Sequence, residues 1–527
     1  MKRSPAVIYP FLFTFYAVVG VYAQNIGNIS IIRMIRSLLT ILIVATLFYF
    51  FLRSRTGDNH RAGLLFILFL AWFFFGHVYR LLVASLKLTP SPVADFILLA
   101  LWSMLLLLLG TRKAWEKIKN PELLTNFLNV TSWIILILPL YLTGSSALRI
   151  IHQNKLVREQ RNRSELPTTS DISVHPDIYL IILDAYGRAD FIEKAFHYNN
   201  SEFITFLEEK GFFIAEQSRT NYPQTLLSVS SMLNMNYLDN WTRGLEKSNN
   251  RIPLNEMIFD SNTRKVLENL EYTYIDSSFL AEYNASRDDK AQPDESKVLL
   301  NRFERLLLST TVLDIFVRNL DLNLPLPTYE THRNDIENAF EYLNNSTTIE
   351  SPKFVYVHIL APHPPFVYDE EGNPIQPDYP YTMSDGEAYP GSIEDYATGY
   401  AKEIVYLNHE MESVITTILE DSQTPPIIIL QGDHGPGNYF TILGPNTEPC
   451  LEERYSILNA YYFPDQNYEY LYPAITPVNS FRAVFNTYFD ANLPLLEDRN
   501  YYASYAYPYR FTDITDRAST CTVDFSP

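Results

Sequence analysis

The chain has 527 residues and a formal net charge of −19, and its length allows several domains. Residues 1–150 hold 14 Lys+Arg and 4 Asp+Glu, so the remaining residues carry a balance of −29. Such an acidic main part argues against binding to nucleic acid, whose phosphates are held by basic surfaces.

The first 150 residues are dominated by apolar stretches that approach or exceed the roughly 20 residues needed to cross a bilayer. They are Val7–Ala23, Ile32–Leu52, Leu64–Leu86, Val93–Leu109 and Val130–Leu142, the last extending to Leu148. A soluble protein with five such stretches would have almost no polar surface there. We therefore predict a transmembrane helical domain of about five helices over residues 1–148. The first stretch also resembles a signal peptide, and we favour an uncleaved helix.

The basic residues favour an external position for the C-terminal part of the chain. Five spans with the N-terminus inside place this part outside, and so do four spans after a cleaved signal peptide. Lys2 and Arg3 fit this orientation, whereas Arg33 and Arg36 oppose it. We therefore expect a multi-pass protein of the cell membrane with an extracytoplasmic catalytic domain.

Residues 149–175 differ from both the apolar part before them and the globular part after them. The first half is basic and predicts a juxtamembrane helix that lies on anionic lipid headgroups. Residues 164–175 lack apolar periodicity and predict a linker. The remaining residues, 176–527, are expected to form the catalytic domain.

Three apolar runs in the C-terminal part have the length and composition of buried strands. They are Ile178–Leu183, Phe354–Leu360 and Ile427–Leu430. Helical patterns separate them, at Glu202–Lys210, Thr225–Asn234, Thr331–Asn344 and Ile393–Leu419. Continuous apolar strands that alternate with helices predict an α/β domain with a doubly wound, mostly parallel sheet.

Each predicted strand ends on polar residues. Asp184 follows the first strand, His363 follows the second, and Asp433 and His434 follow the third. A single Asp there is an ordinary turn residue. Because ligands bind beyond the carboxyl ends of parallel strands, three such endings favour one shared site, with the Asp–His pair as metal ligands.

Thr225 opens the helical segment that follows Pro223. Taken alone, it is most simply an N-cap. The functional interpretation is a nucleophile, because a helix N-terminus stabilises an alkoxide and a phosphorylated side chain. A threonine hydroxyl needs activation, which a divalent metal held by Asp184, Asp433 and His434 would supply.

Four motifs, taken in this order and spacing, resemble the alkaline phosphatase superfamily. They are "IILDAYGR", "TLLSVSSM", "HILAPHPPF" and "LQGDHGPG", and they cover roughly residues 176–440. Within the superfamily they look like the sulfatase-type branch that includes lipoteichoic acid synthases and phosphoethanolamine transferases. This resemblance implies an alkaline-phosphatase-like, sulfatase-like catalytic domain behind the membrane helices.

The resemblance also implies the roles of the site residues. It implies one divalent metal, held by Asp184, Thr225, Asp433 and His434. Mn²⁺ or Zn²⁺ suits two carboxylates, a hydroxyl and a histidine, with Mg²⁺ and Ca²⁺ as alternatives. The T-x-x-S segment of the family matches Thr225 and Ser228. His363 matches a histidine that contacts the substrate, and we expect Arg188 to bind substrate as well.

The sequence departs from the family in three places. The C/S-x-P/A-x-R motif of true sulfatases does not occur around Thr225, which argues against formylglycine chemistry. The first ligand is Asp184, where lipoteichoic acid synthases and phosphoethanolamine transferases usually have Glu. No second set of metal ligands is evident, and we expect His358 to be a core residue.

These residues predict an enzyme that moves a phospho-headgroup from a membrane lipid to an envelope glycan or lipid through a covalent Thr225 intermediate. The alternative is hydrolysis at the same site, as a phosphodiesterase or another phosphoric or sulfuric ester hydrolase. A non-catalytic membrane scaffold is the remaining hypothesis, and it would be expected to lack a ligand or the nucleophile. All the matched positions are present.

Cys450 and Cys521 are the two cysteines of the chain, and both lie in the part expected outside. They are either two unrelated thiols or a disulfide. In an oxidising exterior, a pair of cysteines in one domain favours a bridge. We predict a disulfide that ties down the C-terminal tail.

Overall fold

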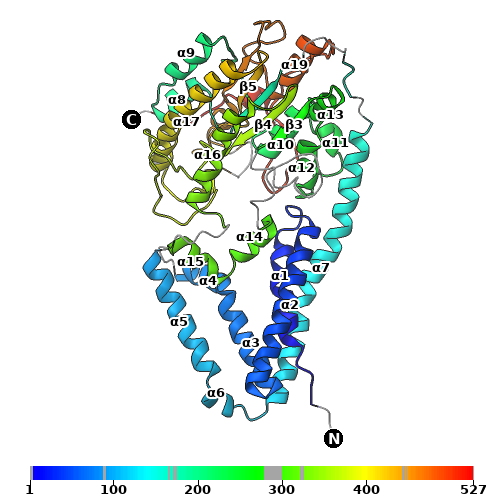
Figure 1. Ribbon diagram of the computed structural model, residues 1–527, viewed down its shortest axis with the longest axis vertical. Coiled ribbons are helices and arrows are strands. Elements are labelled where there is room, and N and C mark those ends of the chain that lie inside the picture. The colour runs from blue at the N-terminus through cyan, green and yellow to red at the C-terminus, as the bar shows by residue number, and fades with distance from the viewer. Residues whose placement is uncertain are drawn as a thin grey trace. The chain divides into compact units, whose positions relative to one another are not determined.

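The computed structural model describes residues 4–86, 91–163, 166–169, 175–277, 300–320, 326–441, 446 and 448–525. The chain forms two compact units (Figure 1). The first comprises Met1–His152 and Ser296–Thr328. The second comprises Gln153–Glu295 and Tyr329–Pro527. The grouping of residues 296–328 with the N-terminal helices was not predicted, because no motif or change of composition marks it.

The first unit is helical. Its elements are α1 (Tyr9–Gln24), α2 (Ile31–Thr56), α3 (Asn59–Phe73), α4 (Phe75–Leu86), α5 (Pro92–Gly110), α6 (Arg112–Glu116), most of α7 (Pro121–Arg161), α14 (Arg302–Leu308) and α15 (Val312–Leu320). Among the described residues, α2, α5 and α7 are long and apolar enough to cross a membrane. The bent pair α3 and α4 brings the number of spans to as many as four.

The prediction of apolar membrane helices is thus confirmed, with three to four spans where about five were expected, and the difference arises in two places. Helix α1 has 16 residues and rises about 24 Å, less than the roughly 30 Å of a bilayer core. The stretch Leu64–Leu86 is not one helix, since α3 and α4 meet at a bend of 51°. Just after this bend, a Cβ on Gly76 would lie 2.6 Å from the Thr310 carbonyl oxygen, so the two segments approach closely only because residue 76 is glycine.

Helix α7 joins the last predicted span to the basic stretch that follows it. The 41-residue helix runs through Pro139 to Arg161, so the basic stretch does not form a separate interfacial helix as predicted. Its last turns belong to the second unit, where Val157 is buried beside Leu254 and Met257. This end of the helix therefore makes an apolar contact with protein, and the predicted contact of its basic side chains with lipid headgroups stays a prediction.

The second unit contains a six-stranded sheet in the order β2-β6-β5-β1-β4-β3. The strands are β1 (Ile178–Leu183), β2 (Phe213–Ile214), β3 (Thr273–Asp276), β4 (Lys353–Ile359), β5 (Ile427–Gly432) and β6 (Asn459–Tyr462). Strands β3, β4, β1 and β5 are parallel, and β6 pairs antiparallel with both β5 and β2. The predicted mostly parallel sheet is confirmed, and the short strands β2, β3 and β6 were not predicted.

Helices cover both faces of this sheet. The longer ones are α8 (Ala189–Phe196), α9 (Ser201–Glu209), α10 (Thr225–Leu233), α12 (Ile252–Phe259), α13 (Asn262–Asn269), α16 (Tyr329–Ser346), α17 (Ile393–Asp421) and α19 (Ser480–Phe489). Shorter ones include α11 (Asp239–Thr242) and α18 (Leu451–Tyr455). A two-stranded ribbon, β7 (Tyr501–Tyr502) and β8 (Thr512–Asp513), lies near the C-terminus.

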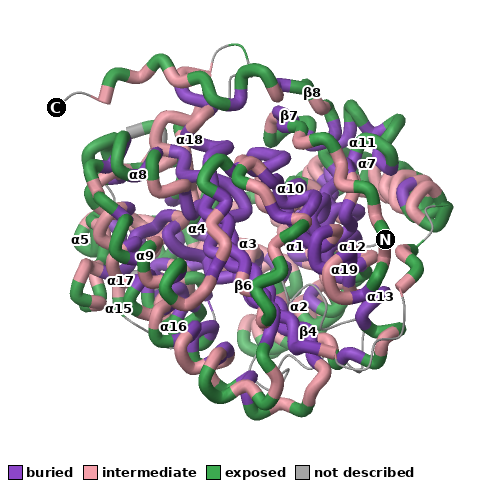
Figure 2. Tube along the Cα trace, turned by 90° about the horizontal axis from the view of Figure 1, so that it is seen from above, coloured by how far each residue is buried: buried purple, intermediate pink, exposed green. Residues whose placement is uncertain are grey.

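Strand β1 shows why its sequence is continuously apolar. Tyr179, Ile181 and Leu183 belong to one core cluster, which includes residues of α16 and α17. The alternate residues Ile178, Leu180 and Ile182 belong to another, which includes residues of α10, α13 and α19. All six side chains are buried, as for a central strand between two helical layers, and β4 is likewise buried throughout (purple in Figure 2).

Candidate active site

The register of the central strands brings the predicted site residues to one edge of the sheet. Leu183 pairs with Ile359 of β4 and with Gly432 of β5, so the three strands end at the same level. The backbone N–H of Asp184 donates to the Ile359 carbonyl at 2.9 Å. Asp184 and Asp433 therefore leave the sheet side by side, as the sequence predicted.

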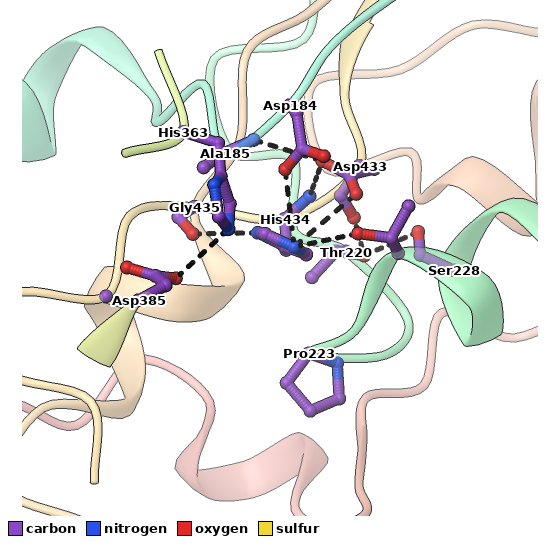
Figure 3. Close-up of polar contacts among 12 residues, drawn as sticks. Asp184, Ala185, Thr220, Pro223, Ser228, His363, Asp385, Asp433, His434 and Gly435 are labelled. Carbon is purple, nitrogen blue, oxygen red and sulfur yellow. Dashed lines mark hydrogen bonds and ion pairs between the residues drawn. The ribbon is translucent and has the colours of Figure 1, made fainter. Parts of the chain in front are cut away.

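Asp184, Asp433 and His434 form a buried cluster. One ligand atom from each lies within 4.8 Å of the others. His434 Nε2 is 3.7 Å from Asp184 Oδ1 and 3.4 Å from Asp433 Oδ2. Figure 3 shows the three side chains pointing toward one another.

The donor atoms of this cluster fit a divalent cation. Asp433 Oδ1 accepts from the backbone N–H groups of Ala185 and His434, whereas Asp433 Oδ2 and Asp184 Oδ1 are buried without a hydrogen-bond partner in the described part of the chain. His434 Nδ1 lies 3.0 Å from the Gly435 carbonyl, so Nδ1 carries the proton and Nε2 keeps a lone pair. Buried carboxylates are costly without a positive partner, and a metal ion here would bind both of them and Nε2.

Thr225 lies beside this cluster. Helix α10 begins at Thr225 with Gln224 at the N-cap, so Thr225 is the first helical residue and not the cap. Its hydroxyl is 3.2 Å from His434 Nε2, and the residue is half-buried, which leaves it accessible. The side chain predicted as nucleophile and metal ligand is therefore next to the predicted metal ligands.

Ser228, the second residue of the T-x-x-S match, contacts the site through the Thr220 hydroxyl. Its buried hydroxyl is 2.9 Å from the Thr220 hydroxyl, which in turn donates to the Asp433 carbonyl at 2.7 Å. Ser228 thus helps to fix the backbone at Asp433. Figure 3 shows this hydroxyl pair.

His363 and Asp385 form another wall of the site. The His363 side chain is 13% exposed, its Nδ1 lies 2.7 Å from the Pro364 carbonyl, and its Nε2 lies 4.0 Å from Asp385 Oδ2. Burial opposes ionisation of Asp385, but Arg454, His363, His434 and the Tyr396 hydroxyl together outweigh burial and lower the pKa of Asp385 to about 2. Asp385 is therefore a carboxylate at neutral pH.

His358 is buried in β4, as a core residue would be, but it also contacts a predicted metal ligand. Its Nε2 is 3.3 Å from Asp184 Oδ2, the oxygen that does not face His434. Burial opposes ionisation of Asp184, yet the nearby His363, His358 and His434 together hold its pKa below the usual range. His358 thus faces Asp184 from inside β4 and contributes, with His363 and His434, to keeping it ionised.

The side chain of Arg188 makes its contacts away from the metal-ligand cluster. It pairs with Asp190 at 2.6 Å and donates to the Ser218 carbonyl at 3.0 Å. Arg454, which sequence reasoning missed, lies instead within 3.2 Å of His434 Nε2. It follows His434 by twenty residues without a recognisable motif, and Asp385 comes from an irregular acidic loop, so neither had a signal in the sequence.

The comparisons with known proteins concern the second unit and, in one case, nearly the whole chain. Residues 176–482 match the sulfatase family, and no curated protein matches the chain by sequence. The zinc complex of the C-terminal periplasmic domain of EcEptC from Escherichia coli is 12% identical, with 67% of this chain and 97% of that chain covered and a TM-score of 0.42. The integral membrane protein lipooligosaccharide phosphoethanolamine transferase A from Neisseria meningitidis is also 12% identical, with 90% and 93% covered and a TM-score of 0.33.

The family match spans more than half of the chain and contains every predicted site residue. The remaining N-terminal part supplies apolar helices long enough to anchor the protein in a membrane. The protein is thus a membrane-anchored, sulfatase-like enzyme, and the chain belongs to the sulfatase family.

Proposed function

We propose that this protein moves a phospho-headgroup from a membrane lipid to an envelope glycan or lipid through a phosphorylated Thr225, on the extracytoplasmic side of the membrane. The position of the Thr225 hydroxyl, 3.2 Å from His434 Nε2 at the start of α10, carries this proposal. The membrane helices support it, because they keep the catalytic unit near lipid donors.

In the first half-reaction, Thr225 Oγ1 bonds to phosphorus and the bond from phosphorus to the diacylglycerol oxygen breaks. Asp184, Asp433 and His434 would hold a divalent metal ion, whose positive charge would lower the pKa of the Thr225 hydroxyl. The chemistry of the donor set favours Mn²⁺ or Zn²⁺. The positive end of the α10 helix dipole stabilises the phosphate on Thr225, the first residue of the helix.

His363 handles the protons of both half-reactions. Its Nε2 protonates the leaving diacylglycerol oxygen and then takes the proton of the acceptor hydroxyl that attacks phosphothreonine. Thr225 leaves as the acceptor–phosphorus bond forms, and its oxygen takes back from bulk water the proton that it released to bulk water in the first half-reaction. Each half-reaction thus ends with the protonation state that the next one requires.

Mass spectrometry of the Thr225 peptide tests this proposal after the full-length protein has been incubated with phospholipid vesicles. We expect an adduct with the mass of the phospho-headgroup, lost in Thr225→Ala and partly kept in Thr225→Ser. Thr225→Ala should still bind metal, because three protein ligands remain. Release of free headgroup without an acceptor product would indicate hydrolysis, and normal turnover by Thr225→Ala would exclude the covalent route.

A further inference from the structure

Arg454 connects three segments of the candidate site. Its Nε donates to the Pro223 carbonyl at 2.9 Å, and its Nη1 donates to the Gly435 carbonyl at 3.1 Å and to Asp385 Oδ2 at 2.6 Å. Its Nη2 lies 3.2 Å from His434 Nε2. The residue is only 8% exposed, so the guanidinium is held inside the site rather than at its rim.

Nη2 of Arg454 lies on the side of the guanidinium that is close to His434 and Thr225. Arg454 Nη2 and Thr225 Oγ1 both lie 3.2 Å from His434 Nε2, so they are no more than about 6.4 Å apart. One phosphoryl group spans such a gap, with phosphorus near Thr225 and a non-bridging oxygen near Nη2. Guanidinium groups are suited to phosphate oxygens because they are planar and always charged.

Nη2 of Arg454 would lose its hydrogen-bond acceptor, His434 Nε2, when a metal ion is bound. With Nε2 bound to a metal ion, its lone pair no longer accepts from Arg454, and the N–H of Nη2 needs another partner. A buried charged donor without a partner is costly. An anionic oxygen of the substrate would satisfy Nη2.

Two glycines of the "DHGPG" segment have a role in this arrangement. A Cβ on Gly437 would lie 2.7 Å from both carboxylate oxygens of Asp385, and a Cβ on Gly435 would lie 2.0 Å from the Glu453 carbonyl oxygen. The glycines therefore allow Asp385 and the start of α18 to approach the Asp–His pair. The segment is shaped for the Arg454–Asp385 pair as well as for the metal ligands.

We propose that Arg454 binds a non-bridging oxygen of the transferred phosphoryl group and that Asp385 is its positioning residue. Asp385 fixes one edge of the guanidinium and accepts from the Tyr396 hydroxyl at 2.9 Å, so Nη2 stays directed at the site. This inference rests on the proposed function for the identity of the transferred group. It gives Arg454 a role in substrate binding, which the sequence analysis expected of Arg188.

Binding of inorganic phosphate to the metal-loaded, full-length protein tests the role of Arg454 without turnover. We expect Arg454→Gln and Arg454→Lys to weaken phosphate binding by about tenfold or more, with the metal content unchanged. Asp385→Asn should weaken it less, because the charge of Arg454 remains. Arg482→Lys is the matched control: Arg482 also donates to two backbone carbonyls, at 2.8 and 2.7 Å, and should bind phosphate normally when replaced.

Added guanidinium gives a readout that a merely structural arginine would not move. It should restore phosphate binding to Arg454→Ala and not to Asp385→Asn. Wild-type phosphate affinity in Arg454→Lys and Arg454→Gln would overturn the proposal. Loss of bound metal in step with loss of phosphate in both variants would also overturn it, because Arg454 would then only support His434. If phosphate binding depends on Arg454 but no Thr225 adduct forms, the proposed transfer fails while the anion site stands.

Discussion

At the residue scale, the two carboxylates of the cluster divide their oxygens between the protein and the site. Asp433 uses Oδ1 for backbone N–H groups and leaves Oδ2 toward His434, whereas Asp184 directs Oδ2 to His358 and leaves Oδ1 toward His434. This division fixes each side chain before any ligand arrives. The site is therefore preorganised.

Removal of either carboxylate should abolish metal binding without unfolding the domain. Asp184→Ala and Asp433→Ala each delete a ligand but little packing, so we expect loss of bound metal and of activity with a similar melting temperature. Elemental analysis of purified full-length protein measures the metal, with Asp421→Ala, at the exposed end of α17, as the control. A full metal equivalent in either variant would remove that residue from the site.

Glu403 gives the protein a dependence on pH that is separate from the metal ligands. This buried residue of α17 accepts from the Val367 N–H at 2.9 Å, and burial raises its pKa to about 8. A raised carboxyl pKa means that the folded state binds the extra proton, so stability falls as the pH rises toward and through 8. We expect Glu403→Gln to lessen the drop in melting temperature between pH 6 and 9. An equal drop in both proteins would contradict this assignment.

Residues next to a strand could be predicted, whereas residues brought in by loops could not. Asp184, Asp433 and His434 directly follow apolar runs, so the geometry of a parallel sheet already places them together. Arg454 and Asp385 depend on how α18 and an irregular loop fold over the sheet. That arrangement depends on tertiary contacts, such as the close approach of Asp385 to Gly437. No periodic pattern in the sequence predicts it.

At the scale of elements, the same contrast separates the strands from the membrane helices. Strands β1, β4 and β5 were predicted because their continuous burial requires continuous apolar sequence. The bend between α3 and α4 lies in a uniformly apolar stretch. Hydropathy alone does not show where the helix axis changes direction within such a stretch. Just after the bend, Gly76 packs against Thr310, which is more than 200 residues away in the sequence.

Arg161 and Arg158, at the end of α7, allow a comparison between a buried arginine that contacts protein and an exposed one that could contact lipid. Arg161 is largely buried and donates to the Asp260 carbonyl at 2.6 Å and to Asn234 Oδ1 at 3.1 Å. Arg158 is 60% exposed and reaches Glu256 only at 3.5 Å. We expect Arg161→Ala to destabilise the second unit by about 1–3 kcal/mol and Arg158→Ala by less than about 1 kcal/mol. Chemical denaturation in detergent measures both, and equal small effects would favour the predicted contact with lipid.

At the scale of the whole molecule, the predicted disulfide is present. Cys450 and Cys521 are joined across a sequence separation of 71, and the backbone N–H of Leu451 donates to the Thr520 carbonyl at 2.9 Å. The bridge thus ties the C-terminal tail to the residue that precedes α18. Both cysteines belong to the second unit.

Reduction of this bridge should lower the stability of the second unit by roughly 2–4 kcal/mol, because the unfolded chain gains freedom. We expect dithiothreitol to lower the melting temperature of the wild-type protein. A Cys450→Ser, Cys521→Ser double variant should melt at the lower temperature with or without the reductant. Two free, alkylatable thiols in unreduced wild-type protein, denatured before labelling, would show that the bridge does not form in cells.

The position of the disulfide has a consequence for the newly synthesised protein before export. Cys450 immediately precedes the short helix that delivers Arg454, and in the reducing cytosol this bond does not persist. We expect an unexported chain to hold its guanidinium loosely and to bind phosphate weakly, as reduced protein should in the phosphate assay. Export would then serve as a checkpoint: the enzyme becomes competent only after crossing the membrane, and the lipids of the cytoplasmic leaflet are spared on the way.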